Sequence, residues 1–126
     1  MDAITFIDYT AGVDVTLDLQ TYTLDATYKA KVLTVDASSM DAGEVLTIDG
    51  DEAVTKLDVT SGAGADVLGL GTLADVVDSG AGNDSVTGGA AAESIKGGNG
   101  YDTISSAAGA DSLNGGAGKD TFTGGG

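Results

Sequence analysis

The sequence predicts an all-β protein in which short parallel strands coil into a solenoid. Three observations support this fold class. Eighteen of the 21 glycines lie beyond residue 60, which marks a change of architecture along the chain. Apolar and polar residues alternate with period two in the first half of the chain, which is typical of half-buried strands. From residue 61 onward a nine-residue pattern repeats, and a short fixed period is the signature of a solenoid.

The first half of the chain contains six short stretches of this alternation, each bounded by polar or small residues. Only three of the 21 glycines, Gly12, Gly43 and Gly50, lie here. We therefore expect residues 1–60 to form a strand-rich amino-terminal segment that continues the solenoid and caps it or mediates assembly. The stretches are ITFID (4–8), VDVTLDL (13–19), YTLDA (22–26), KVLTVDA (31–37), EVLTIDG (44–50) and TKLDV (55–59).

The second half, residues 61–126, divides into seven blocks of nine residues and a short remainder. Every block has an acid at its sixth place and an aliphatic or aromatic residue at its eighth. Glycine recurs at the first, second and fourth places, and each glycine in a helix costs about 1 kcal/mol relative to alanine, so a helix is disfavoured. The blocks are SGAGADVLG, LGTLADVVD, SGAGNDSVT, GGAAAESIK, GGNGYDTIS, SAAGADSLN and GGAGKDTFT.

Each block has the residues for one short strand and one turn. Three residues around the eighth place form a strand with its large side chain directed inward. Glycines at places two and four permit a positive φ and a close backbone approach, so carbonyl oxygens and the acid can surround an ion in the turn. Hard oxygen ligands at flexible spacing favour calcium over magnesium or transition metals.

The acids are also expected to stack. If two blocks make one rung of the solenoid, acids eighteen residues apart lie at the strand spacing of about 4.8 Å. Two carboxylates at that distance repel each other by about 3.5 kcal/mol at an effective dielectric of 20. A calcium ion between them turns the repulsion into attraction, so we expect folding of the repeats to depend on calcium.

These blocks resemble the glycine- and aspartate-rich nonapeptides of RTX proteins, with the pattern GGxGxDxUx in which U is large and apolar. The resemblance covers residues 61–126, and it implies a right-handed parallel β-roll loaded with calcium. The preceding stretch LTVDASSMDAGEVLTIDG is similar to the strand-rich segments before such repeats in bacterial surface-layer proteins.

Departures from the pattern alternate along the chain. Successive blocks of a β-roll contribute turns to opposite edges, and blocks one, three, five and seven all keep Gly-x-Gly-x-Asp. The other three blocks lose glycines or replace aspartate by glutamate. We therefore expect calcium along one edge, held by Gly62, Gly64, Asp66, Gly80, Gly82, Asp84, Gly98, Gly100, Asp102, Gly116, Gly118 and Asp120. Few or no ions are expected along the weaker edge of Asp75, Glu93 and Asp111.

Composition restricts the function. Twenty acids against five basic residues give a net charge of −15, which disfavours nucleic acid and anionic membranes as partners. The sequence contains no histidine or cysteine, which removes the usual zinc ligands and the Ser-His and Cys-His nucleophile pairs. No transmembrane stretch appears in the sequence, so membrane insertion is not expected.

The leading interpretation is a non-enzymatic calcium-binding module of an extracellular surface layer, fibre, adhesin or virion exterior, with a homo-oligomer or filament as the assembly. The alternative is an accessory β-roll of a secreted polysaccharide-modifying enzyme or protease. A third possibility is ice binding by flat threonine arrays. The turn places between the glycines hold Ala63, Ala81, Asn99 and Ala117, so we expect no regular threonine array.

Overall fold

The computed structural model describes residues 2–5, 15–18, 32–50 and 56–125, and in these residues all regular structure is β-strand. The predicted all-β class is therefore confirmed. The strands are β1 (Asp2–Thr5), β2 (Val15–Asp18), β3 (Val32–Asp36), β4 (Leu46–Asp49), β5 (Lys56–Thr60), β6 (Val67–Gly69), β7 (Val76–Asp78), β8 (Ser85–Thr87), β9 (Ser94–Asn99), β10 (Thr103–Ala107), β11 (Ser112–Ala117) and β12 (Thr121–Gly124).

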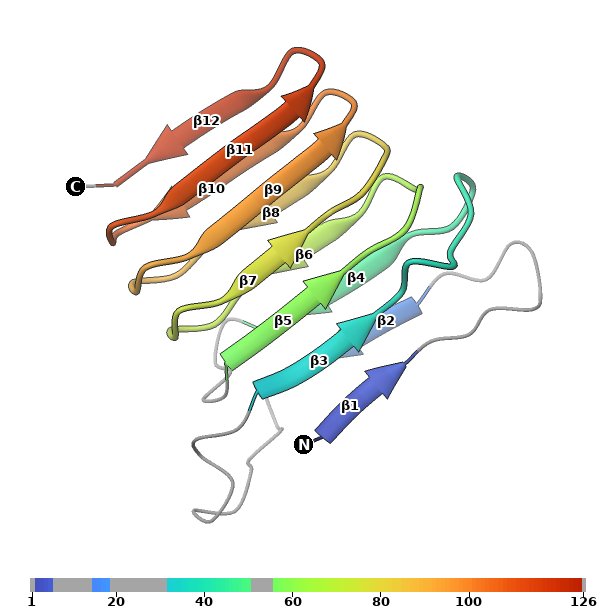
Figure 1. The fold of residues 1–126 in the computed structure, drawn as a ribbon, viewed down its shortest axis with the longest axis horizontal. Helices are drawn as coiled ribbons and strands as arrows, with labels where there is room; N and C mark the ends of the chain where they lie inside the picture. Colours follow the sequence, from blue (N-terminus) through green and yellow to red (C-terminus); the bar gives the residue numbers. More distant parts are fainter. Residues whose placement is uncertain (1, 6–14, 19–31, 51–55, 126) are drawn as a thin grey trace.

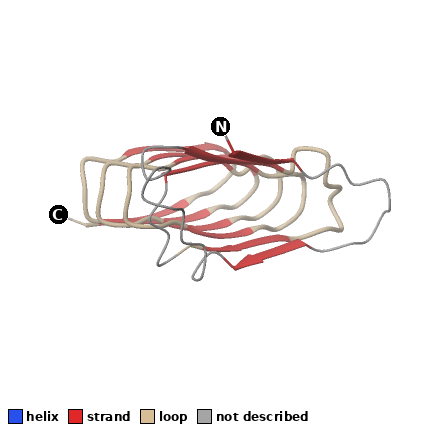
Figure 2. Ribbon diagram, turned by 90° about the horizontal axis from the view of Figure 1, so that it is seen from below, coloured by secondary structure: helices blue, strands red, loops and turns tan. Residues whose placement is uncertain are grey.

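The strands form two parallel sheets that face each other. The odd-numbered strands make one sheet in the order β1-β3-β5-β7-β9-β11, and the even-numbered strands make the other in the order β2-β4-β6-β8-β10-β12. The chain thus passes from one sheet to the other after every strand, as Figure 1 shows. Seen at right angles, the two layers are joined by turns along both edges (Figure 2). The molecule is a β-solenoid.

The strand register confirms that two nine-residue blocks make one rung. Val67 pairs with Ser85, and Thr103 pairs with both Ser85 and Thr121, so each step along the sheet is eighteen residues. The first half of the chain continues the same sheets, because β5 pairs with β7 and β4 pairs with β6. Whether residues 1–60 and 61–126 act as separate domains stays a prediction.

The predicted strands overlap the observed strands but begin and end at different residues. The stretches at 31–37, 44–50 and 55–59 contain or overlap β3, β4 and β5, and those at 4–8 and 13–19 overlap β1 and β2. The stretch at 22–26 lies outside the described residues. In the later repeats the strands are longer than three residues, because pairing continues into the next block, where Gly116 pairs with Gly98.

The core is a single column of aliphatic side chains between the two sheets. In the repeats it is built by the eighth-place residues, which alternation of side chains along a strand directs inward. Full burial of one such side chain contributes about 1.5–3 kcal/mol. The first five blocks bury one or two aliphatic residues each and the last two bury none fully, so the core of the repeats is thin. The core residues are Leu33, Val35, Ala37, Met40, Leu46, Ile48, Leu57, Val59, Leu68, Leu70, Val77, Val86, Ile95 and Ile104.

The described residues include no helix long and apolar enough to cross a membrane.

Candidate metal centre

Turns that carry the predicted calcium ligands stack along one edge of the solenoid, here called the first edge. Turns 61–66, 79–84, 97–102 and 115–120 join the odd sheet to the even sheet, ahead of β6, β8, β10 and β12. Turns 70–75, 88–93 and 106–111 return the chain along the second edge. The predicted division of the blocks between two edges is therefore seen in the fold.

Aspartates of the first edge form a ladder directed along the solenoid axis. The backbone N–H of Asp66 donates to Oδ1 of Asp84 at 2.8 Å, and the N–H of Asp84 donates to Oδ1 of Asp102 at 2.9 Å. The same bond joins the N–H of Asp102 to Asp120 at 3.1 Å. At the start of the row the N–H of Leu46 donates to Asp66 at 2.8 Å. One oxygen of each carboxylate is thus fixed by the preceding rung.

The second carboxylate oxygens of this row have no hydrogen-bond partner. Asp66, Asp84 and Asp102 are each at most 2% exposed, and the Oδ2 atom of each is buried and unpaired. A buried polar group without a partner costs about 1–3 kcal/mol, and more when it is charged. A row of such oxygens is the donor set that a hard divalent cation takes, because carboxylate and carbonyl oxygens are its preferred ligands.

Electrostatics of the row favour the same conclusion. Burial and, to a smaller extent, the neighbouring carboxylates of Asp66 and Asp102 raise the pKa of Asp84 to about 6, against the lowering effect of the hydrogen bond from the N–H of Asp66. Burial also raises the pKa of Asp66. Without a cation the ionised row is therefore disfavoured, and a bound divalent ion would supply the missing positive charge.

Glycines at the second and fourth places bring neighbouring turns into backbone contact. Gly98 and Gly100 have φ values of +103° and +135°. A Cβ atom on Gly98 would lie 1.9 Å from the carbonyl oxygen of Gly80 in the previous turn. A side chain is excluded there by both the backbone conformation and the space. Gly80, Gly82, Gly116 and Gly118 share the positive φ.

Turn 61–66 departs from this pattern. Gly62 and Gly64 do not adopt a positive φ, although the sequence gives them the same places as Gly80 and Gly82. The turn stacks on residues 37–45, which are not a nonapeptide, and a Cβ on Gly62 would lie 2.5 Å from the carbonyl oxygen of Met40. These two glycines are still needed for the close approach.

The second edge carries the acids that we expected to bind few or no ions. Asp75 accepts from the N–H of Leu57 at 2.7 Å, and Asp111 accepts from the N–H of Glu93 at 3.1 Å. Asp75 has one buried unpaired oxygen and Glu93 has two. The second edge therefore also presents unpaired oxygens, and its ion loading stays a prediction.

Glu93 interrupts the ladder of the second edge. Among the described residues no hydrogen bond joins the N–H of Asp75 to Glu93, in contrast to the aspartate pairs of the first edge. Burial and, to a smaller extent, the nearby Asp111 raise the pKa of Glu93 to about 7. The longer glutamate side chain thus places a carboxylate in the row without the anchoring bond.

One turn of the second edge keeps the conformation of the first. Ala107 has a φ of 58° and Gly109 a φ of 142°, at the same second and fourth places. Alanine in this left-handed region costs about 1–2 kcal/mol, and glycine at the same position would avoid that cost. Turn 106–111 therefore has the backbone shape of the first-edge turns at a cost in conformational energy.

The described residues contain no cluster of three or more acidic, histidine or cysteine side chains that could hold a metal. Each pair of adjacent turns instead brings together two carboxylates, as Asp84 and Asp102 show. Any further ligands at a site between two such turns would be backbone carbonyl oxygens, which the glycine-rich turns supply in number. The ligand set expected from the sequence stays a prediction.

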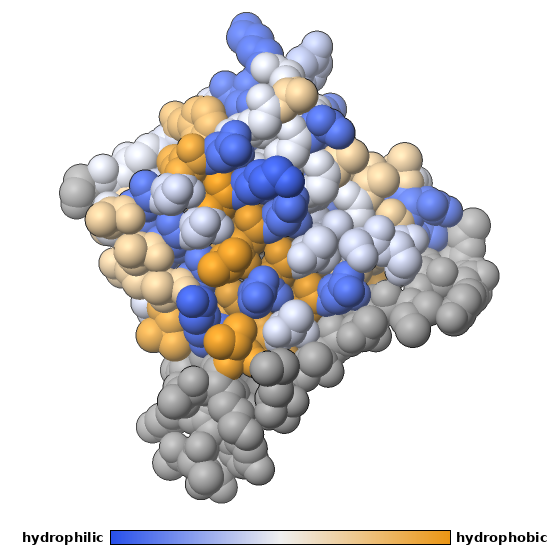
Figure 3. All heavy atoms as spheres, in the orientation of Figure 1, coloured by the Kyte–Doolittle hydropathy of each residue, from blue (hydrophilic) through white to orange (hydrophobic). Residues whose placement is uncertain are grey.

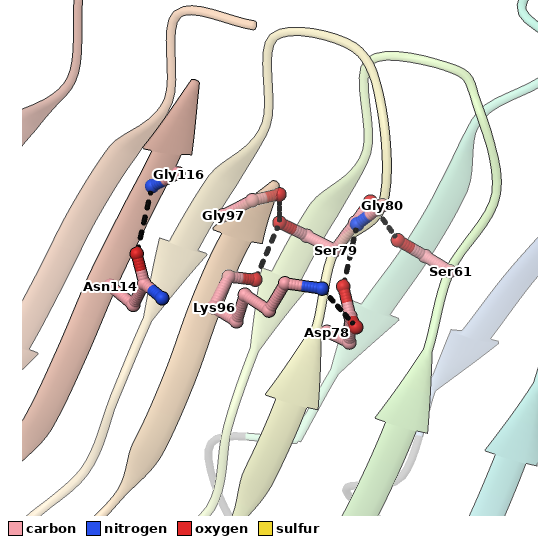
Figure 4. A network of polar contacts seen from close by, with 8 residues as sticks. All are labelled: Ser61, Asp78, Ser79, Gly80, Lys96, Gly97, Asn114 and Gly116. Atoms are coloured by element: carbon pink, nitrogen blue, oxygen red, sulfur yellow. Dashed lines mark hydrogen bonds and ion pairs between the residues drawn. The ribbon is translucent and has the colours of Figure 1, made fainter. Parts of the chain in front are cut away.

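Two residues that the sequence analysis did not identify, Asp78 and Asn114, stabilise the start of first-edge turns. Asp78 accepts from the N–H of Gly80 at 3.3 Å, and Asn114 accepts from the N–H of Gly116 at 3.0 Å (Figure 4). Both stand at the ninth place, two residues before a left-handed glycine. An Asp or Asn side chain that accepts a hydrogen bond from the backbone N–H two residues later is common in turns, so this spacing could have been recognised in the sequence.

Inward-facing serines join the same turns. The hydroxyl of Ser61 donates to the carbonyl oxygen of Ser79 at 2.7 Å, and that of Ser79 donates to Gly97 at 2.8 Å (Figure 4). The nearby hydroxyl groups of Ser61 and Ser79 also lower the pKa of Asp66 and Asp84, although burial outweighs this effect. The first-place serines therefore support both the backbone and the carboxylates.

Comparison with known proteins agrees with this geometry. Residues 70–104 and 97–126 match the family model described as RTX calcium-binding nonapeptide repeat (4 copies). Searches of curated proteins and of solved structures returned no match. The matched residues include three acids of the first edge, Asp84, Asp102 and Asp120. They also include all three acids of the second edge. Residues 70–126 of this chain are therefore RTX calcium-binding nonapeptide repeats in a β-solenoid, and the ion that they bind is calcium.

Proposed function

We propose that this protein is a non-enzymatic structural or assembly module that works outside a cell, as part of a surface layer, fibre, adhesin or virion exterior, and that folds on binding calcium. The observation that carries the proposal is the row of buried carboxylates on the first edge, each anchored through one oxygen and unpaired at the other. Such a row stabilises a chain only when a cation is bound to it.

The ions are proposed to lie between successive first-edge turns. Asp66, Asp84, Asp102 and Asp120 supply the carboxylates, and backbone carbonyl oxygens of the same turns are the proposed further ligands. Glycines at places two and four let neighbouring turns approach closely enough for this. Bound calcium supplies the positive charge that offsets carboxylate repulsion between rungs. The protein residues position these oxygens and exclude water from them.

The energies support folding that is coupled to calcium. Three buried unpaired oxygens on the first edge cost about 3–9 kcal/mol together, at about 1–3 kcal/mol each. The net stability of a folded domain is only about 5–15 kcal/mol. The penalty is as large as the stability itself, so the calcium-free repeats are expected to be largely unfolded.

An extracellular location is proposed from the calcium affinity expected of such sites. Calcium sites of extracellular modules have dissociation constants of about 10⁻⁴–10⁻³ M, which extracellular calcium fills and resting cytosol leaves empty. Folding would then wait until the chain leaves the cell. The net charge of −15 favours this coupling, because calcium lowers the self-repulsion of the folded state.

Assembly is proposed to use the ends of the two sheets. Among the described strands, β11 and β12 each pair with one neighbour only, and Phe122 is 47% exposed although its place is inward in the other repeats. An unpaired strand edge is a template for another chain. Residues 1–60 are proposed to cap the opposite end or to mediate the same contact.

A calcium titration followed by far-ultraviolet circular dichroism tests the folding proposal. We expect β signal to rise with calcium and to be lost on adding a chelator. A chelator-insensitive β signal would contradict it. Sedimentation velocity at saturating calcium tests assembly separately, since a homo-oligomer or filament is expected and a strict monomer would refute that part alone.

A further inference from the structure

Hydroxyl side chains form two straight columns on the outer face of the even-numbered sheet. Residues on either side of the inward eighth place point outward, and in β8, β10 and β12 every one is serine or threonine. The first column is Ser85, Thr103 and Thr121, and the second is Thr87, Ser105 and Thr123. The register joins each residue of a column directly to the next without a bulge between them.

The spacing of the columns is fixed by the sheet. Neighbours within a column lie about 4.8 Å apart, and the two columns lie about 6.6 Å apart, which is twice the rise per residue. In tetrahedral water with O···O distances of about 2.75 Å, oxygens two hydrogen bonds apart are separated by about 4.5 Å. Oxygens three hydrogen bonds apart in a staggered chain are separated by about 6.9 Å. Both spacings of the columns are within about 0.3 Å of these values.

The six hydroxyls are free to bind such water. Ser105 is partly exposed and the other five residues are exposed. None of the six hydroxyls makes a hydrogen bond with the protein in the described part of the chain. Four of the six are threonines, whose β-branching restricts the side chain to few rotamers, so the hydroxyls are held in place before binding.

The outer face of the odd-numbered sheet differs from the hydroxyl columns, because it carries charged residues. Its outward residues at the equivalent places include Asp78 and Lys96, which form an ion pair at 2.8 Å, and hydrophilic side chains are scattered over that face among apolar ones (Figure 3). The columns of β8, β10 and β12 carry no charge at all, on a protein with a net charge of −15. The array ends at β6, where Val67 and Gly69 take the two places.

We propose that this face binds ice, through a layer of water ordered on the two hydroxyl columns. The turn places between the glycines hold no threonine array, as expected, and the hydroxyl array lies on the strands instead. A polysaccharide is less well matched, because no aromatic side chain stands in the columns to stack on a sugar ring. A second copy of the chain is less well matched, because the face has no large apolar side chain in the columns.

Inhibition of ice recrystallisation by the whole chain in calcium tests the proposal. The variant Thr103→Tyr places a bulky ring at the centre of the array, and Ser94→Tyr places the same ring on an exposed strand position of the opposite sheet. Circular dichroism in calcium confirms the fold of each protein. We expect inhibition by the wild type and by Ser94→Tyr, and loss of inhibition in Thr103→Tyr.

Three results would overturn the proposal. The first is a folded wild type without any effect on recrystallisation. The second is a Thr103→Tyr variant that folds and inhibits as well as the wild type. The third is wild-type protein that has no effect on ice but is retained by cellulose or chitin in a manner that Thr103→Tyr abolishes, which would identify a polysaccharide surface. If Thr103→Tyr fails to fold, Thr103→Val takes its place, because it keeps the shape and removes the hydroxyl.

Discussion

The substitution Asp84→Asn is predicted to have opposite effects with and without calcium. Asp84 lies in the middle of the first-edge row, where its Oδ1 atom accepts the N–H of Asp66 and its Oδ2 atom is buried without a partner. Asparagine keeps the size of the side chain and the accepting oxygen but removes the charge. The calcium-free protein should therefore become more stable and the calcium-bound protein less stable.

The pKa of Asp84 sets the size of the effect. A change from the ordinary value of 3.8 to about 6 corresponds to about 3 kcal/mol, and solvent screening at the turn reduces this to about 1–3 kcal/mol. This is the gain expected in chelator. In calcium the variant loses a carboxylate shared by two rungs, and a site at 100 times its dissociation constant contributes about 2.7 kcal/mol to stability.

Urea unfolding in calcium measures the loss. Refolding in chelator by an added osmolyte measures the gain, because the calcium-free repeats are expected to be largely unfolded. Asp58→Asn, which removes a partly exposed acid on the outer face of β5, is the matched control and should change stability little in either condition. If Asp84→Asn destabilises the protein equally in calcium and in chelator, the unpaired oxygen is not a cation ligand and the reasoning fails.

Three further predictions follow from the same geometry. The calcium-free protein should lose its remaining stability as pH rises from about 4 to about 7, because the folded-state pKa values of Asp84 and Glu93 are raised to about 6 and about 7 and protonation favours the fold below them. Circular dichroism in chelator should therefore show more β signal at pH 4 than at pH 7, and saturating calcium should reverse this trend. A calcium-free β signal that does not change with pH would contradict the prediction. Glu93→Asp should give the N–H of Asp75 the ladder partner that it lacks and raise the unfolding free energy in calcium by about 1 kcal/mol, whereas an unchanged or lower value would argue against the ladder. Ala107→Gly should stabilise the protein by about 0.5 kcal/mol, because it removes an alanine from the left-handed conformation. The control Ala108→Gly, at a position without a positive φ, should destabilise the protein. Thermal melts in which both variants shift stability in the same direction would argue against strain at Ala107.

The repeat made most of the fold predictable. An acid and an aliphatic residue at fixed places in nine-residue blocks imply both the strand and the turn, and the eighteen-residue rung follows from placing successive turns on opposite edges. The hydrogen bond from the N–H of Asp66 to Asp84 confirms that stacking. In the first half the spacing is irregular, so the strands were recognised from alternation alone and their ends are less accurate.

Finer details of the turns depended on neighbours that the pattern does not encode. Gly62 has the same place in its block as Gly80 but a different backbone conformation, because it stacks on the non-repetitive residues 37–45. The reverse holds for Ala107, which adopts the left-handed conformation that its residue type disfavours. The missing bond at Glu93 likewise depends on where the longer glutamate side chain places its carboxylate, which the sequence alone does not give.

A crystal structure of the protein grown in calcium, with anomalous scattering used to locate the ions, tests the central claim most directly. The account predicts calcium between the first-edge turns, within about 2.3–2.6 Å of the Oδ2 atoms of Asp66, Asp84 and Asp102. First-edge turns that are well ordered in such crystals with no anomalous peak beside these oxygens would contradict it.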